Sequence, residues 1–131
     1  MKKALTPVFL LIFLQIAHTQ PVFRLIEPGR SAALYHAGHE KVIDTALEML
    51  ASDSRLLGGR PLVITDKITD NTVIVGIPGN EPALDALITK YKLDISDIEG
   101  KWEAYKMHVV RDRNNSYLFI LGSDPRGAAY G

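Results

Sequence analysis

The sequence contains no cysteine and only one tryptophan among its 131 residues. Without thiols the chain cannot form disulfide bonds, thiolate zinc sites, a cysteine nucleophile or a lipid-modified cysteine. It also lacks an excess of charge, because 15 basic residues balance 15 acidic ones. A balanced charge provides no strong attraction for nucleic acid or for an anionic membrane.

The one long apolar run, residues 8–14, lies near the N-terminus and follows two lysines. It is too short to span a bilayer, which takes about 20 residues. A basic start, a short apolar middle and a more polar end are typical of a secretory signal peptide. We therefore predict that residues 1–20 are a signal peptide, cleaved after Thr19 or Gln20, and that the mature chain is secreted or periplasmic. A buried N-terminal strand or helix is the alternative.

The remaining residues, 21–131, are enough for one domain with one hydrophobic core. Signal cleavage removes Lys2 and Lys3 but no acidic residue, so 13 basic residues remain against 15 acidic ones. The mature chain therefore carries a small negative charge, and it has no second apolar run long enough for a membrane span. We expect neither nucleic acid nor a membrane among its partners.

Apolar periodicity predicts an α/β domain that is α+β-like, a small mixed β-sheet with helices packed against it. Short β-branched or alternating segments indicate strands, and apolar residues at three- and four-residue steps indicate helices. The predicted strands cover residues 22–26, 33–35, 62–65, 73–75, 102–110 and 117–121, and the predicted helices cover residues 39–52 and a segment after Asn80. The order is ββαββαββ, followed by the start of another helix.

Local sequence explains several boundaries of these elements. Residues 27–30 contain Pro-Gly and favour a turn between the first two strands. Asn80 can cap the second helix with its side-chain oxygen. Residues 114–116 favour a turn that pairs the last two strands as an antiparallel hairpin. Trp102 and Tyr105 are expected on opposite faces of the first strand of that hairpin.

The C-terminal residues have the pattern of a buried strand followed by the beginning of a helix. Residues 117–121 are continuously apolar, as in a strand that is covered on both faces. Asp124 is a suitable N-cap, and Pro125 suits the first helical position because its missing N–H would be unpaired there. The sequence ends six residues later, whereas even a helix of about 12 residues is marginal alone. We therefore expect the chain to be a fragment of a larger protein.

Two histidines, His36 and His39, lie close to Glu40 and invite comparison with a metal site. No H-E-x-x-H motif and no third nearby ligand accompanies them. We therefore predict no metal site and place these residues around the start of the first helix, with a metal site as the alternative. His108 is expected on the polar face of a strand, exposed or hydrogen-bonded.

Two glycine-containing turns, residues 76–80 and 122–127, lie between a strand and a helix, where phosphate groups often bind. Neither turn has the pattern of a P-loop or of G-x-G-x-x-G, and Asp124 places a negative charge in the second. Helix capping explains these glycines better, with nucleotide binding as the alternative. We expect no cofactor.

Acidic residues are numerous, but their spacing indicates no pair in a shared cleft of the kind that glycoside hydrolysis needs. The acidic residues considered for such a pair are Asp66, Asp70, Asp94, Asp97, Glu99 and Glu103. No G-x-S-x-G motif is present to supply a serine nucleophile. The sequence therefore predicts no catalytic residue.

Several ordered segments together resemble one known family. These segments are residues 74–80 with 84–88, residues 93–103 and residues 121–131. The most specific parts are the block Glu99-Gly-Lys-Trp-Glu103 and the final block G-S-D-x-R-G-x-x-Y-G. In this order and spacing they resemble the N-terminal domain of glycoside hydrolase family 115, the xylan α-1,2-glucuronidases. The similarity covers about residues 23–131.

The resemblance implies an extracytoplasmic enzyme that removes glucuronic acid or 4-O-methyl-glucuronic acid from glucuronoxylan. In that family a small α/β domain precedes the catalytic barrel, which supplies the main catalytic apparatus. The implied partners of this chain are therefore the catalytic barrel, which the sequence does not include, and glucuronoxylan. No position matches a catalytic motif of the family, so we expect a scaffold that is inactive alone.

The resemblance also assigns structural or interdomain roles to residues of the two blocks. Gly127 and Gly131 lie four apart, on one helix face, and let that helix approach the sheet or the barrel closely. Arg126 is expected to pair with Asp124 or with a carboxylate of the barrel. Trp102 is expected to be a core or interdomain anchor, with a sugar platform as the alternative. For the whole chain the alternative is a self-standing carbohydrate-binding or interaction module.

Overall fold

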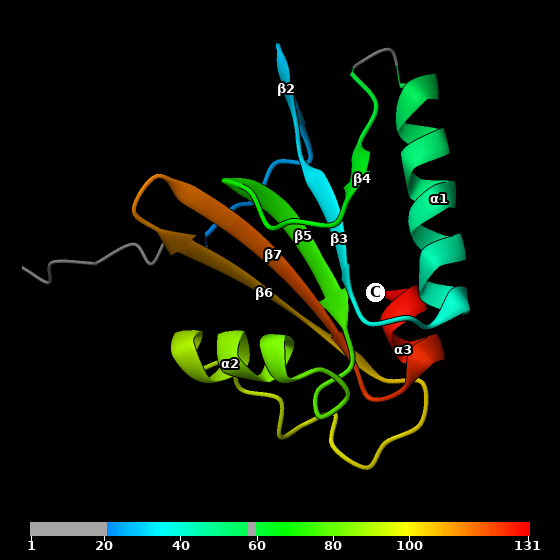
Figure 1. The fold of residues 1–131 in the computed structure, drawn as a ribbon, viewed down its shortest axis with the longest axis vertical. Helices are drawn as coiled ribbons and strands as arrows, with labels where there is room; N and C mark the ends of the chain where they lie inside the picture. The colour runs from blue at the N-terminus through cyan, green and yellow to red at the C-terminus, as the bar shows by residue number, and fades with distance from the viewer. Residues whose placement is uncertain (1–20, 58–59) are drawn as a thin grey trace, which may run out of the picture.

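The computed structural model describes residues 21–57 and 60–131, and it confirms the predicted α/β class. A five-stranded mixed sheet carries helices on both faces, and a two-stranded hairpin lies at one end of it (Figure 1). The predicted signal peptide lies outside the described residues. In chain order the elements are β1 (Ile26–Glu27), β2 (Arg30–Ser31), β3 (Ala33–Ala37), α1 (Lys41–Leu56), β4 (Val63–Thr65), β5 (Asn71–Gly76), α2 (Pro82–Tyr91), β6 (Tyr105–Asp112), β7 (Asn115–Gly122) and α3 (Pro125–Tyr130).

The five-stranded sheet has the strand order β4-β3-β5-β7-β6. Strands β4, β3, β5 and β7 run parallel, whereas β6 pairs antiparallel with β7 at one edge. The predicted hairpin between the last two strands is therefore confirmed, but the predicted position of its turn, residues 114–116, is wrong, because Asn115 and Ser116 belong to β7. Its turn consists of Arg113 and Asn114, between the paired residues Asp112 and Asn115, and Arg113 adopts the left-handed conformation with φ 58°.

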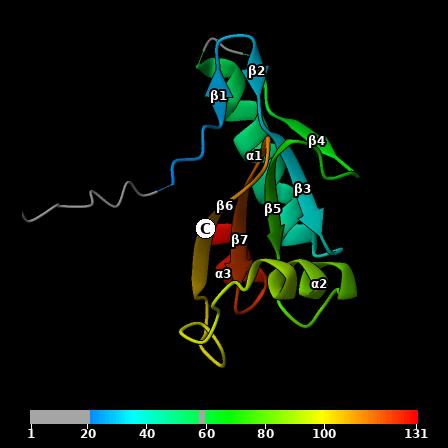
Figure 2. The same cartoon turned by 90° about the vertical axis from the view of Figure 1, so that its left-hand side faces the viewer.

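The predicted first strand, over residues 22–26, is wrong. The chain pairs only from Ile26, in a short hairpin around the predicted turn, where Gly29 adopts φ 80°. This tight turn confines β1 and β2 to two residues each, and the main sheet begins only at Ala33. Residues 21–57 and 60–131 thus contain one strand more than predicted. Figure 2 shows the β1–β2 hairpin extending from one end of the larger sheet.

Helix α1 continues four residues beyond its predicted end at residue 52. Its last turn is anchored by a buried polar side chain, Ser54. The Ser54 hydroxyl donates a hydrogen bond to the Ala51 carbonyl at 2.7 Å and accepts one from the Leu62 N–H at 2.9 Å. The polar residues 52–54 interrupt the apolar pattern in the sequence, so this tertiary anchor was not visible in the periodicity.

The predicted N-cap of helix α2, Asn80, is wrong. The residue at the N-cap position is Glu81, which makes no side-chain cap, and Pro82 begins the helix. Pro82 has no N–H that would need a cap, which reduces the demand at this end. Asn80 lies one residue too early, and its amide instead donates to Glu40 Oε1 at 2.8 Å.

The sheet separates two hydrophobic cores. Helices α1 and α3 cover one face, and α2 covers the other (Figure 1). Because both faces are covered, neighbouring residues of β5 are buried on opposite sides: Val73 and Val75 belong to the α1 side, and Ile74 belongs to the α2 side. The same alternation in β7 places Ile120 against α1 and Phe119 against α2. This arrangement confirms the prediction that residues 117–121 form a strand covered on both faces.

We predict a large loss of stability when Phe119 is replaced by alanine. Its side chain is fully buried, and its ring lies 5.9 Å from that of Tyr91 and 6.4 Å from that of Tyr117, centroid to centroid. Phe119→Ala should lower the free energy of unfolding by about 3–5 kcal/mol, measured by chemical denaturation. The control Met49→Ala, at a 63% exposed position, should change it by less than about 0.5 kcal/mol. Equal effects of the two substitutions would contradict the described core.

Candidate functional site

The segments 99–103 and 122–131 come together at one corner of the sheet. The first segment leads into β6, and the second continues from the end of β7 into α3. Because β6 and β7 pair antiparallel, with Tyr105 opposite Gly122, the start of β6 lies beside the end of β7. We call this region the β6–α3 corner.

The carboxylate of Asp124 holds the β6–α3 corner together. Its Oδ1 accepts a hydrogen bond from the Gly127 N–H at 2.7 Å, which confirms the predicted N-cap of α3. Its Oδ2 accepts a second bond, also of 2.7 Å, from the Glu103 N–H. These backbone donors, Gly127 first and then Glu103, hold the pKa of Asp124 below its ordinary value. One side chain therefore both caps α3 and fixes the segment that precedes β6.

Ser123 adds a second link between the same two segments, which the sequence analysis did not assign. Its hydroxyl accepts a hydrogen bond from the Ala104 N–H at 3.0 Å and donates one to the Ala104 carbonyl at 3.1 Å. The Ser123 N–H donates to that same carbonyl at 2.8 Å. Ser123 and Ala104 thus continue the antiparallel pairing of β6 and β7 by one residue beyond the strands, through the Ser123 backbone and its side chain.

Two of the glycines at this corner are required by close contact. A Cβ at Gly127 would collide with the backbone carbonyl of Ala104, and a Cβ at Gly131 would collide with Ile120 and lie 3.0 Å from the Tyr105 ring. Both positions therefore let α3 lie directly on the strands, as the sequence analysis expected. The same applies to Gly122, where a Cβ would collide with the Ala128 backbone.

Of the two predicted partners of Arg126, Asp124 and a carboxylate of the barrel, Asp124 is not the partner. The Arg126 Nη1 donates to Glu103 Oε1 at 2.9 Å. The Asp124 oxygens accept the backbone N–H groups of Glu103 and Gly127 instead. The Arg126 hydrogen bond lowers the pKa of Glu103. The pair joins the two segments a third time, on the outer surface of the corner.

Trp102 does not lie on a strand, so the predicted placement of Trp102 and Tyr105 on opposite faces of one strand is wrong. The strand begins only at Tyr105, because Glu103 adopts a left-handed conformation, φ 51°, that interrupts the extended backbone. Trp102 is 80% exposed, which excludes a role in the core of this domain. It lines a shallow hollow of about 510 Å³ together with Val42 and Pro125. We call this surface the Trp102 hollow.

A second cluster lies where β3 and β5 end. The connections from these two strands leave in opposite directions, since α1 leads to β4 and α2 leads towards β6 and β7. In open α/β sheets ligands bind at such a switch point. Here His36, whose side chain is 6% exposed, fills the space: its Nδ1 lies 2.6 Å from Asp44 Oδ1 and its Nε2 lies 3.0 Å from Glu40 Oε2.

His39 and Glu40 directly precede α1, as expected, whereas His36 lies within β3, and the two imidazoles do not converge. His39 is exposed, whereas His36 points at carboxylates. Burial raises the pKa of Glu40, but hydrogen bonds, led by the one from the Asn80 amide, outweigh burial and lower it overall. Among residues 21–57 and 60–131, no group of three or more histidine, aspartate or glutamate side chains is arranged to hold a metal ion.

The two glycine-containing turns use their amides within the protein. The Gly79 N–H donates to Asp85 Oδ1 at 2.8 Å, and the Gly127 N–H donates to Asp124. The turns flank a hollow of about 420 Å³, which Asp85 and Glu99 also line. Carboxylates therefore occupy or border the positions where a phosphate would bind, so the structure favours capping over nucleotide binding.

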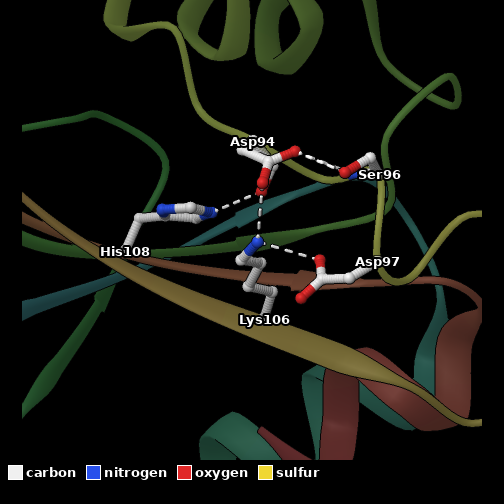
Figure 3. A network of polar contacts seen from close by, with 5 residues as sticks. All are labelled: Asp94, Ser96, Asp97, Lys106 and His108. Atoms are coloured by element: carbon white, nitrogen blue, oxygen red, sulfur yellow. Dashed lines mark hydrogen bonds and ion pairs between the residues drawn. The ribbon is translucent and has the colours of Figure 1, made fainter.

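Lys106 fastens the acidic segment between α2 and β6 to the sheet (Figure 3). Its Nζ lies 3.2 Å from Asp94 Oδ2 and 2.9 Å from Asp97 Oδ1. His108 donates a ring N–H to the Asp94 carbonyl at 2.9 Å, which confirms the hydrogen-bonded position expected for it. Hydrogen bonds from Ser96, and then the bond from Lys106, lower the pKa of Asp94 to about 2.

Asp94, Asp97 and Glu103 are not suited to act as a general acid. That role needs a raised pKa, whereas the pKa values of Asp94, Asp97 and Glu103 are all lowered. The causes are hydrogen bonds, chiefly from Ser96 to Asp94, from Lys106 to Asp97 and from Arg126 to Glu103. These three carboxylates therefore link neighbouring segments of the domain.

No protein-family model matches this chain, and no curated protein matches it significantly. Within the part of the chain that the structure describes, no helix combines the length and the apolar character that a membrane span requires.

We predict that Gly127→Ala destabilises the domain. The added methyl group has no room against the Ala104 carbonyl, so α3 must move away from β6 and weaken the bonds to Asp124. Overpacking of this kind costs about 1–3 kcal/mol of unfolding free energy, measured by thermal and chemical denaturation. Ser52→Ala, on the exposed side of α1, is the control and should have little effect. A fully stable Gly127→Ala protein would show that α3 does not lie on the strands.

We predict that Asp94 contributes to stability in a pH-dependent way. Its pKa falls from 3.8 to about 2 on folding, so its contribution is complete above about pH 4 and is lost as the pH falls towards 2. The denaturation midpoints of the wild type and Asp94→Asn should therefore differ at pH 7 and converge near pH 2. In a side-chain NMR titration, Ser96→Ala should raise the pKa of Asp94. A midpoint difference that does not change with pH would contradict this prediction.

Proposed function

We propose that this chain is the N-terminal, non-catalytic domain of a secreted glycoside hydrolase similar to family 115. Such enzymes remove glucuronic acid or 4-O-methyl-glucuronic acid from xylan. In this proposal residues 1–20 direct export, residues 21–131 form a scaffold, and the catalytic barrel of the same family packs against that scaffold.

The observation that carries the proposal is the contact between the two most specific blocks of the sequence resemblance. They are separated in the sequence, yet Asp124, Ser123 and Arg126 of the second block bind the segment 103–104 that continues from the first. Residues that hold the same two segments together are expected to occur together in the sequences of one family. The β6–α3 corner thus gives the resemblance a structural reason.

The exposed apolar side chains near this corner support a docking role. Trp102 is 80% exposed, Tyr130 61% and Val42 42%. Exposed apolar residues that gather around a rigid corner are typical of a surface that another domain covers. The Arg126–Glu103 pair lies beside the Trp102 hollow. Its charged groups, which now contact solvent, can form polar contacts with another domain at the rim of that surface.

The lowered carboxylate pKa values support a scaffold rather than an enzyme. Glycoside hydrolysis requires two carboxylates with separate roles, one of which stays protonated. The acidic groups that surround the β6–α3 corner are held in their ionised form by hydrogen bonds. A role in binding the barrel is consistent with such fixed groups.

The alternative, a self-standing carbohydrate-binding module, is supported by the same exposed aromatic residues. Trp102, Tyr105 and Tyr130 are 80%, 45% and 61% exposed, and aromatic rings are common sugar platforms. The two proposals differ in what the surface binds, a protein domain or a xylan chain.

We predict that the chain associates with a separately produced family 115 catalytic barrel and that Trp102→Ser weakens this association at least about tenfold. Analytical ultracentrifugation measures the association. Leu56→Ser is the matched control, because Leu56 is 84% exposed at the opposite end of α1 and lies outside the Trp102 hollow. Neither substitution should lower the thermal stability of the chain alone.

The same samples are tested for activity and binding with aldouronic acids and with unsubstituted xylan. The chain alone should release no glucuronic acid. Turnover by the chain alone would refute the scaffold role. Binding to xylan that Trp102→Ser abolishes, without association with the barrel, would favour the carbohydrate-binding module.

A further inference from the structure

Helix α3 covers only part of the sheet face on which it lies. A Cβ at Gly122 of β7 would collide with Ala128, and a Cβ at Gly131 would collide with Ile120, so α3 runs antiparallel to β7 from the carboxyl end of that strand. The six residues of α3 extend about 9 Å, whereas the eight residues of β7 extend about 26 Å. More than half of the length of β7 therefore lies beyond the end of α3.

The part of this face beyond α3 is apolar. Met107 and Val109 of β6 are in register with Ile120 and Leu118 of β7, so their side chains point to the same face. Met107 is 46% exposed, and Val109 and Leu118 are half-buried. Figure 1 shows α3 beside the lower end of α1, whereas β6 and β7 extend well beyond it. Apolar side chains of both strands are therefore left without a helix of this domain over them.

A hollow of about 210 Å³ lies at the end of α3. It is lined by Ala46 and Leu50 of α1, by Ile120 of β7 and by the last residues of α3. Because Ile120 pairs with Met107, the hollow adjoins the uncovered face of β6. The hollow and the uncovered strands thus form one continuous apolar surface beside α1. We call it the sheet trough and define it by Ala46, Leu50, Met107, Val109 and Leu118.

The occupant that fits the sheet trough is an amphipathic helix. A further strand cannot pair there, because the backbone groups of β7 already bond to β5 on one side and to β6 on the other. The layer on this face consists of helices, α1 and α3, and a helix buries one apolar stripe against a sheet. From Ile120 to Ser116 the strand extends about 13 Å, which matches about nine residues of helix.

Arg111 gives the far end of the sheet trough a positive charge. It follows Val109 on the same face of β6, and its Nη2 donates to the Val22 carbonyl at 3.0 Å, which holds the guanidinium group in place. Within residues 21–57 and 60–131 no carboxylate forms an ion pair with Arg111. A helix that runs in the direction of α3 has its C-terminus at this end, where a positive charge is favourable. The charge therefore favours this direction over the opposite one.

We infer that the sheet trough binds an amphipathic α-helix of about two to three turns, which lies antiparallel to β7 and in line with α3. The apolar stripe of this helix contacts Met107, Val109 and Leu118 on the sheet and Leu50 on α1. Its last turn carries an acidic residue beside Arg111. A helix of this length is marginal alone, so the burial of its apolar stripe in the sheet trough stabilises it.

This surface is separate from the one on which the proposed function depends. The sheet trough shares no residue with the Trp102 hollow, and the helix that fits it is defined by its apolar stripe and its charge rather than by the activity of any enzyme. Failure of one proposal therefore leaves the other intact.

A helical extension of about twelve residues, fused after Gly131 of the full chain, tests the inference. The contacts of Gly127, Ala128 and Gly131 with the strands set the phase of the helix, so leucines at the third, fourth, seventh and eleventh added positions face the sheet trough. Alanine, lysine and glutamate occupy the other positions, with glutamate in the last turn. This extension should raise the thermal denaturation midpoint by at least about 5 °C, because its leucines become buried.

The matched control extension has the same composition but a different order. Its leucines occupy the second, fifth, sixth and ninth added positions, which face solvent. It should change the denaturation midpoint by less than about 2 °C.

Substitutions within the domain locate the contact. Val109→Lys places a charge in the sheet trough and should remove most of the gain in midpoint, whereas Val63→Lys, at a 59% exposed position of the opposite edge strand β4, should leave the gain unchanged. Arg111→Glu should also reduce the gain, and lysine instead of glutamate in the last turn of the extension should then restore it. Each gain is the difference between the extended and unextended forms of one variant, so the effect of the substitution on the domain alone cancels.

NMR contacts between the Met107 methyl group and the added leucines provide a measurement that does not depend on stability. Such contacts are expected for the first extension and not for the control extension. Equal gains from the two extensions, a gain that Val109→Lys leaves intact, or a gain that does not respond to Arg111→Glu would each overturn the inference.

Discussion

The position of the C-terminal helix depends on one carboxylate, that of Asp124. It accepts one N–H from α3 and one from the segment before β6, both at 2.7 Å. These two donors belong to different segments, since α3 follows β7 and Glu103 precedes β6. The N-cap of a short helix therefore also connects the two strands of the hairpin. The glycine at position 127 is a consequence, since α3 held in this way leaves no space for a side chain against the Ala104 carbonyl. The outward position of Trp102 follows as well, because Glu103 must turn its N–H towards Asp124.

The two ends of the parallel sheet differ in how their polar groups are used. At the carboxyl ends, the donors and acceptors are paired within the protein: His36 with Glu40 and Asp44, and the Gly79 N–H with Asp85. At the amino ends, the Arg111 guanidinium group faces a pocket with several of its donors unused.

Much of the fold was predictable, because the local sequence and the tertiary structure agree for most elements. The apolar run of β7, the β6–β7 hairpin and the Asp124 cap depend on neighbouring residues, and all three were predicted. Three of the errors concern residues whose partners are distant in sequence, whereas the errors at the first strand and at Trp102 have local causes in the conformations of Gly29 and Glu103. Asn80 binds Glu40 instead of its own helix, and the end of α1 depends on the contact between Ser54 and Leu62. The pairing of Arg126 with Glu103 was missed for the same reason.

The sequence by itself determined the class of the fold, the main helices and strands and the cap of α3, because periodicity, β-branching and capping act over a few residues. Only the tertiary structure decided that Ser123 would extend the pairing of β6 and β7 and that Trp102 would face solvent. It also decided that Asn71, Ser116 and Arg111, from three strands, would form one row. The physical reason is strand register, which places residues 45 positions apart, Asn71 and Ser116, on neighbouring strands and which no local pattern records.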